Sequence, residues 1–371
     1  MSSTGWANFY NTTRAARKVI VVDLGFLGDT VHLVPALWEL RRAYAQAELH
    51  VLTTRVGAEV LAQAPCVDRT WVFPLGAPSP PWWKHWGVLR ALRHERFDVA
   101  INFSGSDRSV FTLAAIGARR SLAYQGGRRH FWQRWLVPEW IPRQTLPSPV
   151  FEGRRHLLGL GGFPLAAARF DFVLPPGQQR WAADNVPAGA LHLSVSASLP
   201  LKEWPLANNV DLVRRLLAQR PGSRLVATTA PNPREQARLA ALGDAVRDER
   251  LQLISAPLSI GLLAALLQRC ALHVGPDSGV LHLAAALGVP TVAIFRRYAD
   301  MADWLPRGPH HAHLTAPCDC VNAKFAPCAA AGVARCLGGI AAEAVGAAIF
   351  QLLGEPVETK ATHTGAGSVS P

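Results

Sequence analysis

Short apolar runs alternate with longer helical patterns over most of the chain. Residues 19–24 form a mostly β-branched and apolar run, which is typical of a strand buried on both faces of a parallel sheet. The apolar positions that follow recur at helical spacing, at Val31, Val34, Leu37, Leu40 and Tyr44. Further strands are predicted at 49–53, 69–73 and 98–103. This alternation predicts a parallel sheet with helices on both faces.

A second alternation of strands and helices begins near residue 190. Its strands are predicted at 191–195, 224–228, 251–254, 272–275 and 291–295. Its helices are predicted at 206–220, 233–242, 260–269 and 279–287. Two doubly wound α/β halves predict a central cleft, because open sheets bind ligands beyond the carboxyl ends of their strands.

These patterns divide the chain into two domains with flanking segments. The domains are predicted at 18–175 and 190–356, and a linker rich in Pro, Gly and polar residues joins them at 176–189. The polar segments at 1–17 and 357–371 are predicted to be disordered.

The sequence carries a formal net charge of +12. Such an excess favours anionic partners, namely nucleic acid, acidic lipid surfaces or phosphorylated substrates, although it could also serve solubility alone. No nucleic-acid module motif occurs, so we expect no nucleic-acid partner. No run of 18 uninterrupted apolar residues occurs, and the first 18 residues lack an apolar signal-peptide core. We therefore expect a cytoplasmic protein.

Tryptophan is concentrated in two basic stretches. Residues 80–98 and 128–144 together hold six of the twelve Trp residues, amid Arg, Lys and His. Tryptophan beside basic residues suits a membrane interface or a lipid-linked anionic acceptor. Helices that bury their Trp side chains in the core would give the same pattern, and the sequence leaves both interpretations open.

The stretch GPDSGVLHLAAALGVP at 275–290 reads as a strand end, a turn and a helix that stops before Pro290. The backbone N–H groups and the dipole of a helix start favour an anion, so this turn suits a phosphate or diphosphate. A close ligand approach is easiest at Gly279, which has no side chain. Local sequence alone favours the simpler alternative, in which Asp277 or Ser278 caps the helix.

Two further strand ends carry candidate chemistry. The stretch LGFLGDT at 24–30 places Asp29 near the start of a helix, where its carboxylate is either a general base or an N-cap. In SVSASLPLKEWP at 194–205, Lys202 follows a strand end and either neutralises phosphate or lies in solvent. The dinucleotide fingerprint and the P-loop motif are both absent.

Together these segments resemble the lipopolysaccharide heptosyltransferases, the inverting ADP-heptose-dependent glycosyltransferases of family nine. The resemblance covers about residues 18–353. GPDSGVLHLAAALGVPTVAIF is similar to the family's D-[ST]-G-x-x-H-x-A-A-A-L-x-x-P signature, and LGDTVHLVPAL is similar to its N-terminal signature. KEWP resembles its K-x-W-P, and the segment ending in GARRSLAY resembles part of its acceptor domain.

The resemblance implies a GT-B architecture, in which two Rossmann-like domains face one cleft. The N-terminal domain would bind the acceptor, a lipid-linked anionic oligosaccharide of the lipopolysaccharide inner core. The C-terminal domain would bind the nucleotide sugar. It also implies a protein bound peripherally to the cytoplasmic face of the inner membrane, with no metal cofactor.

The resemblance also implies roles for individual residues. Asp29 would be the catalytic base, and Lys202 would steady the leaving diphosphate. The donor-binding residues would be Ser196, Ser198, Glu235, Asp277, Ser278, Gly279 and His282. The candidates for acceptor phosphates would be Arg108, Arg119 and Arg120.

The sequence departs from the family at FRRYAD, residues 295–300, which replace an aromatic-Gly-Pro-[ST] segment near the nucleotide. Another nucleotide sugar, or another acceptor including a protein, is therefore an alternative. In that case Arg296 and Arg297 would add phosphate contacts. A non-catalytic protein that binds membranes through its basic, Trp-rich face is a second alternative.

Four cysteines crowd into the C-terminal part, spaced C-x-C-x7-C-x7-C at Cys318, Cys320, Cys328 and Cys336. The resemblance extends to them, because many family members carry cysteines here and a related branch that modifies autotransporter proteins binds iron through them. Cys-x-Cys is a poorer structural zinc spacing than Cys-x2-Cys. We expect reduced structural cysteines, with a metal cluster as the less favoured alternative.

Overall fold

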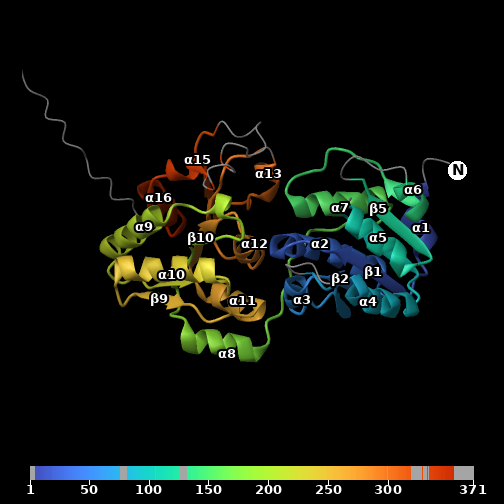
Figure 1. Ribbon diagram of the computed structural model, residues 1–371, viewed down its shortest axis with the longest axis horizontal. Coiled ribbons are helices and arrows are strands. Elements are labelled where there is room, and N and C mark those ends of the chain that lie inside the picture. The colour runs from blue at the N-terminus through green and yellow to red at the C-terminus, as the bar shows by residue number, and fades with distance from the viewer. Residues whose placement is uncertain are drawn as a thin grey trace, which may run out of the picture.

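Two parallel sheets, each with helices on both faces, form the computed structural model (Figure 1). It describes residues 5–75, 82–104, 106–125, 132–298, 300–318, 328, 332 and 334–354. The first sheet has the order β3-β2-β1-β4-β5-β6. Its strands are β1 (Lys18–Asp23), β2 (Glu48–Thr53), β3 (Arg69–Val72), β4 (Val99–Asn102), β5 (Arg120–Tyr124) and β6 (Glu139–Ile141).

The second sheet has the order β12-β11-β10-β7-β8-β9. Its strands are β7 (Leu191–Ser194), β8 (Leu225–Thr228), β9 (Leu251–Ile254), β10 (Leu272–Pro276), β11 (Thr291–Ile294) and β12 (His311–Leu314). Both sheets have the doubly wound strand order in which ligands bind where the order reverses. These reversal points lie between β1 and β4 and between β7 and β10.

Alternate residues of β1 point to opposite faces of the first sheet and enter different cores. Val19 and Val21 pack with one set of helices, and Ile20 and Val22 pack with the other. The first set comprises α1 (Phe9–Thr13), α2 (Leu27–Ala43), α3 (Arg55–Leu61) and α7 (Val150–Leu160). The second comprises α4 (Trp82–His94), α5 (Asp107–Ile116) and α6 (Gln133–Leu136).

The second sheet is covered in the same way. Its helices are α8 (Pro176–Asn185), α9 (Leu206–Gln219), α10 (Pro233–Val246), α11 (Ile260–Arg269), α12 (Gly279–Ala286) and α16 (Ala342–Leu352). Shorter elements are η1 (Gly5–Asn8), η2 (Pro200–Lys202), α13 (Met301–Trp304) and α15 (Arg335–Gly338). In Figure 1 this half lies on the left and the first on the right, with α12 and α2 adjacent between them.

The two halves share an apolar core. Val31 of α2 and Val60 of α3 pack with Leu263 of α11 and Leu283 of α12. Glu59 of α3 also accepts a hydrogen bond from the backbone N–H of Ile260 at the start of α11, at 3.0 Å. These contacts place the starts of α2 and α12 against each other.

The structure corrects the predicted N-terminal disorder for residues 5–17. Phe9 is fully buried, in the same core as Tyr44 and Phe163. The polar residues around Phe9 hid this single anchor from the sequence. Within the predicted linker, residues 176–185 form α8, which packs on α11. The predicted disordered tail lies outside the described residues.

Every predicted strand exists, and three more are present in the described part of the chain, namely β5, β6 and β12. Their sequences carry arginine, glutamate or histidine within or at the start of short apolar runs, which weakens the strand pattern. Among the described residues, no helix is long and apolar enough to cross a membrane.

Candidate functional site

Asp29 lies at the third position of α2, directly beyond the carboxyl end of β1. Its Oδ2 accepts a hydrogen bond from the Phe26 backbone N–H at 3.0 Å, so it does help to cap the helix. Its Oδ1 lies 3.6 Å from Nη2 of Arg154 on α7. The carboxylate is held in place from two sides and remains partly exposed.

A second carboxyl group lies behind Asp29. Asp23, the last residue of β1, is buried and accepts a hydrogen bond from the Thr30 hydroxyl at 2.8 Å. Burial raises the pKa of Asp23, and the Arg154 guanidinium, 4.0 Å away, opposes the rise. Arg154 therefore places one positive charge between two carboxyl groups.

Asp277 stands at the matching position of the other half, between β10 and α12. Its side chain is only 4 % exposed, and its Oδ2 lies 2.7 Å from Lys202 Nζ. The Tyr298 hydroxyl donates to the same oxygen at 3.0 Å, and His282 Nε2 lies 3.6 Å from Oδ1. Burial alone would raise the pKa of Asp277, but His282 and Lys202 outweigh it and lower the pKa to about 2.

The start of α12 is not capped in the simple way that the local sequence favours. Ser278 is the N-cap residue, yet its side chain makes no capping hydrogen bond, and its buried Oγ has no partner among the described residues. The Asp277 carboxylate is engaged by Lys202 and Tyr298. A helix start with an unused hydroxyl and an adjacent lysine suits an anionic ligand.

The two helix starts touch across the domain boundary. A Cβ added at Gly279 would lie 2.6 Å from the Leu27 Cβ, and one added at Gly28 would lie 2.8 Å from the His282 ring. The sequence assigned Gly279 to the close approach of a ligand, but in the structure Leu27 fills the space beside it. His32 Nε2 lies 3.3 Å from His282 Nδ1.

His32 connects α2, the helix that carries Asp29, to α12 of the C-terminal half, and it was missed from the sequence. His32 is buried, with 7 % of its surface exposed, and its ring is in contact with Phe151 and Trp304. Burial lowers the pKa of His32 well below its ordinary value, and His282 and Arg154 lower it further. The spacing from Asp29 to His32, which puts both on one helix face, was the available signal. Arg154 gave no such signal, and Tyr298 was included only as part of the divergent segment 295–300.

The remaining donor candidates gather around the end of β7. Ser196 donates a hydrogen bond to the Glu235 carboxylate at 2.6 Å, and Glu235 is buried at the start of α10. Asn232 caps that helix and donates to the other Glu235 oxygen at 2.8 Å. Ser198 is exposed on the loop that leads to Lys202.

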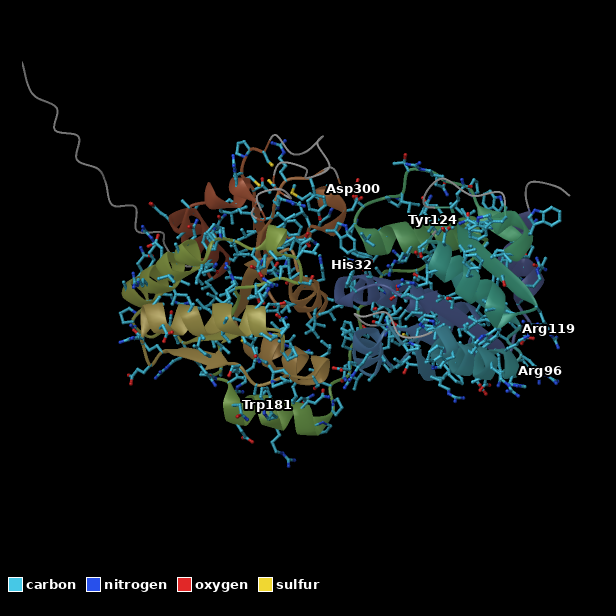
Figure 2. All side chains as sticks on the ribbon, in the orientation of Figure 1. His32, Arg96, Arg119, Tyr124, Trp181 and Asp300 are labelled. Atoms are coloured by element: carbon cyan, nitrogen blue, oxygen red, sulfur yellow. The ribbon has the colours of Figure 1, made fainter. Side chains whose placement is uncertain are left out.

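The three arginine candidates lie in different places. Arg108 is exposed in the first turn of α5, beyond the carboxyl end of β4. Arg119 and Arg120 lie at the amino end of β5, so the parallel strand direction carries them to the opposite edge of the sheet. Arg120 Nη2 pairs with Glu139 at 2.6 Å. Figure 2 shows Arg119 far from His32, so the structure does not bring these two arginines to the cleft.

The cysteines show limited clustering. Burial and a hydrogen bond to Cys318 raise the pKa of Cys336, and Cys328 is buried nearby. Cys320 lies outside the described residues. Within the part of the chain that is described, no three His, Cys, Asp or Glu side chains are arranged to hold a metal ion. The described residues thus do not fit a metal cluster.

A cavity of about 250 Å³ lies beside the two histidines. His32, Phe151 and Phe170 line it from one domain, and His282 and Arg307 line it from the other. It adjoins the Asp277 cluster without including Asp29 or Lys202.

Two Rossmann-like domains that face each other across such helix starts define the GT-B class of glycosyltransferases. The profile of glycosyltransferase family 9 (heptosyltransferase) matches residues 85–331, which is more than half of the chain. The chain belongs to this family and is a glycosyltransferase.

Curated relatives and solved structures agree with this assignment. Lipopolysaccharide heptosyltransferase 1 of Pseudomonas aeruginosa is 28% identical over 298 residues, covering 75% of this chain and 78% of the relative. The core heptosyltransferase OpsX of Haemophilus influenzae is 20% identical over 76% of this chain and 80% of its own length. The family 9 enzyme of Veillonella parvula has a TM-score of 0.77 at 19% identity, covering 91% and 97% of the two chains. Escherichia coli heptosyltransferase II has a TM-score of 0.72 at 17% identity, covering 91% and 98%.

Proposed function

We propose that the enzyme transfers heptose from ADP-heptose to the lipopolysaccharide inner core, with inversion and with Asp29 as general base. The observation that carries the proposal is the pairing of Asp29 with the Asp277–Lys202 cluster at two helix starts that touch. The curated relatives are named as lipopolysaccharide heptosyltransferases, and one solved relative contains ADP-2-deoxy-2-fluoro heptose.

In the proposed reaction, the acceptor hydroxyl oxygen attacks the anomeric carbon of the donor sugar. The bond from that carbon to the diphosphate oxygen breaks, ADP leaves, and the hydroxyl proton passes to Asp29. A positioned base of this kind contributes roughly 10²–10⁴-fold to the rate. Arg154 and the Phe26 N–H hold the Asp29 carboxylate in one orientation.

The leaving diphosphate would lie at the start of α12. Lys202 supplies positive charge there, and Ser278 supplies a hydroxyl that has no partner within the described protein. Backbone N–H groups of the first turn add the positive end of the helix dipole. Glu235 and Ser196 would contact the nucleoside, and Asp277 would orient the donor sugar. These groups supply the counter-charge, and no step is assigned to a metal.

We place the acceptor over the carboxyl edge of the N-terminal domain, where Asp29 and the exposed Arg108 both lie. The acceptor is a lipid-linked anionic oligosaccharide, so the enzyme would work at the cytoplasmic face of the inner membrane.

Substitution of Asp29 by Asn tests the base. We expect Asp29→Asn to lose at least about 10²-fold in kcat while it still binds ADP with wild-type affinity in calorimetry. Lys202→Gln is the matched variant, and it should weaken ADP binding as well as transfer. Wild-type turnover by Asp29→Asn would remove Asp29 from the mechanism.

A different nucleotide sugar is the second candidate donor, because Tyr298 of the divergent segment 295–300 contacts Asp277 directly. A thermal-shift panel of nucleotide sugars separates the two. A ligand at 100 times its dissociation constant stabilises the protein by about 2.7 kcal/mol. A shift with a UDP sugar and none with ADP-heptose would favour the second candidate.

A further inference from the structure

Four exposed aromatic side chains lie on neighbouring helices of the N-terminal domain. They are Trp83 and Trp86 on α4, Phe111 on α5 and Trp135 on α6, with exposed fractions of 60%, 59%, 54% and 85%. We refer to these four residues as the aromatic surface. In the described part of the chain, Phe26 is the one other Phe, Trp or Tyr with an exposed side chain, and it also belongs to this domain.

The helices that carry the aromatic surface are already anchored by other residues. Leu92 of α4 and Val110 of α5 are fully buried against the first sheet, and Trp140 is buried in the same core. Trp132 stacks on Phe111 with ring centroids 4.6 Å apart. The sequence left open whether the two Trp-rich stretches enter the core. In the structure both interpretations hold for different residues, because Trp140 is buried in the core and the aromatic surface is exposed. An exposed aromatic cluster on an anchored helical layer marks an interaction site.

The net charge of the helices that carry the aromatic surface indicates what kind of partner would bind there. Residues 82–144 contain eleven Lys and Arg but four Asp and Glu, so they carry +7 of the chain's +12. Among them Arg90, Arg93 and Arg108 are exposed on α4 and α5. Tryptophan with arginine is the combination that suits the boundary between lipid headgroups and acyl chains, and anionic headgroups attract the arginines.

The aromatic surface begins at the same edge of the sheet as Asp29. His85 Nε2 of α4 donates a hydrogen bond to Pro74 O at 2.9 Å, and its ring stacks on Phe73, directly beyond the carboxyl end of β3. Gln133 of α6 donates to Asp107 at the start of α5, at 2.8 Å. Because parallel strands end at one common edge, the starts of α4 and α5 lie on the edge where α2 presents Asp29.

From this arrangement we propose that the aromatic surface docks on an anionic lipid bilayer and presents the membrane-embedded acceptor to the edge that holds Asp29. The proposal rests on the proposed function for the identity of the acceptor. The bilayer contact itself depends only on the aromatic and basic side chains.

Vesicle co-sedimentation tests the contact, with vesicles of phosphatidylcholine alone or mixed with phosphatidylglycerol. The wild type should bind the anionic vesicles more strongly, and added salt should weaken that binding. The variant Trp83→Ala/Trp86→Ala/Trp135→Ala should lower the partition coefficient by about tenfold or more. The control Leu165→Ala/Val173→Ala, which removes exposed side chains elsewhere in the chain, should bind like the wild type.

Activity supplies the second measurement. The triple variant should lose kcat/KM with the acceptor embedded in vesicles and keep it with the same acceptor deacylated and soluble. Equal vesicle binding by the wild type and the triple variant, or equal losses on both acceptors, would overturn the proposal. The proposal would also be overturned if the wild type forms a dimer and the triple variant loses that dimer but keeps its vesicle binding. The aromatic surface would then be the contact between two copies of the chain. If the wild type transfers heptose to neither acceptor, the proposed function fails and the vesicle result still decides the contact.

Discussion

Replacement of Asp277 by Asn should destabilise the protein in a manner that depends on pH. The pKa of this carboxyl falls from its ordinary value of 3.8 to about 2 in the folded chain. That difference corresponds to about 2–3 kcal/mol of stability at neutral pH. Solvent screens this interaction little, because Asp277 is almost completely buried and Lys202 is mostly covered, so the free energy is not reduced for screening.

The sign follows from the direction of the shift. A folded-state pKa below the unfolded one gives stability that is fully present above pH 3.8 and is lost as the pH falls through about 2. Roughly half of it should remain at pH 3. Asp277→Asn, which has no charge to lose, should therefore unfold at lower urea than the wild type at pH 7, and the gap should narrow by about 1 kcal/mol at pH 3.

Urea unfolding at both pH values measures this gap, and Lys202→Met completes a double-mutant cycle. We expect the two substitutions to be strongly non-additive, because each removes the partner of the other. A gap between wild type and Asp277→Asn that stays constant from pH 7 to pH 3 would refute the assigned ionisation. Additive effects would refute the pairing with Lys202.

Three other predictions use the domain contact, the N-terminal anchor and the arginines. Gly279→Ala should lower kcat/KM by about tenfold or more, because its Cβ would meet Leu27 and push the domains apart, and Leu27→Ala in the same chain should restore part of the activity. Phe9→Ala should cost about 3–5 kcal/mol in urea unfolding, and a loss below 1 kcal/mol would contradict its burial. Arg108→Gln should raise the KM for the acceptor, whereas Arg119→Gln, on the far edge, should leave it unchanged in the same steady-state assay.

The sheet framework was readable from the sequence because its central strands are continuous apolar runs. In β1, for example, four consecutive Val and Ile residues fill both cores, and that pattern has few other interpretations. Edge strands such as β6 and β12 were missed because each is three or four residues long and begins with a polar residue, Glu139 or His311. The anchor at Phe9 depends on one side chain, and one residue gives no periodicity.

The sequence predicted only those residues of the candidate site that come soon after the end of a strand. Asp29, Lys202 and Asp277 all do, and a parallel sheet brings such residues to one edge. Arg154 lies inside a helix that no motif announced, and its position between Asp23 and Asp29 depends on how α7 packs against α2. The prediction that Arg119 and Arg120 lie at the cleft was wrong for a related reason. They adjoin a motif in sequence, but they begin a strand, and the beginning of a strand faces away from the cleft.

The side chains that the sequence missed also indicate how the two halves are coupled. Lys202, His282 and the Tyr298 hydroxyl are the described cationic or titratable groups within 4 Å of the Asp277 carboxylate. If a donor diphosphate draws the Lys202 ammonium toward itself, Asp277 must rely more on His282 and Tyr298. A proton held at His282 Nε2 leaves Nδ1 as an acceptor for His32, which is neutral because it is buried. Donor binding would then strengthen the contact that holds Asp29 over the donor, since His32 lies one helical turn from that carboxylate.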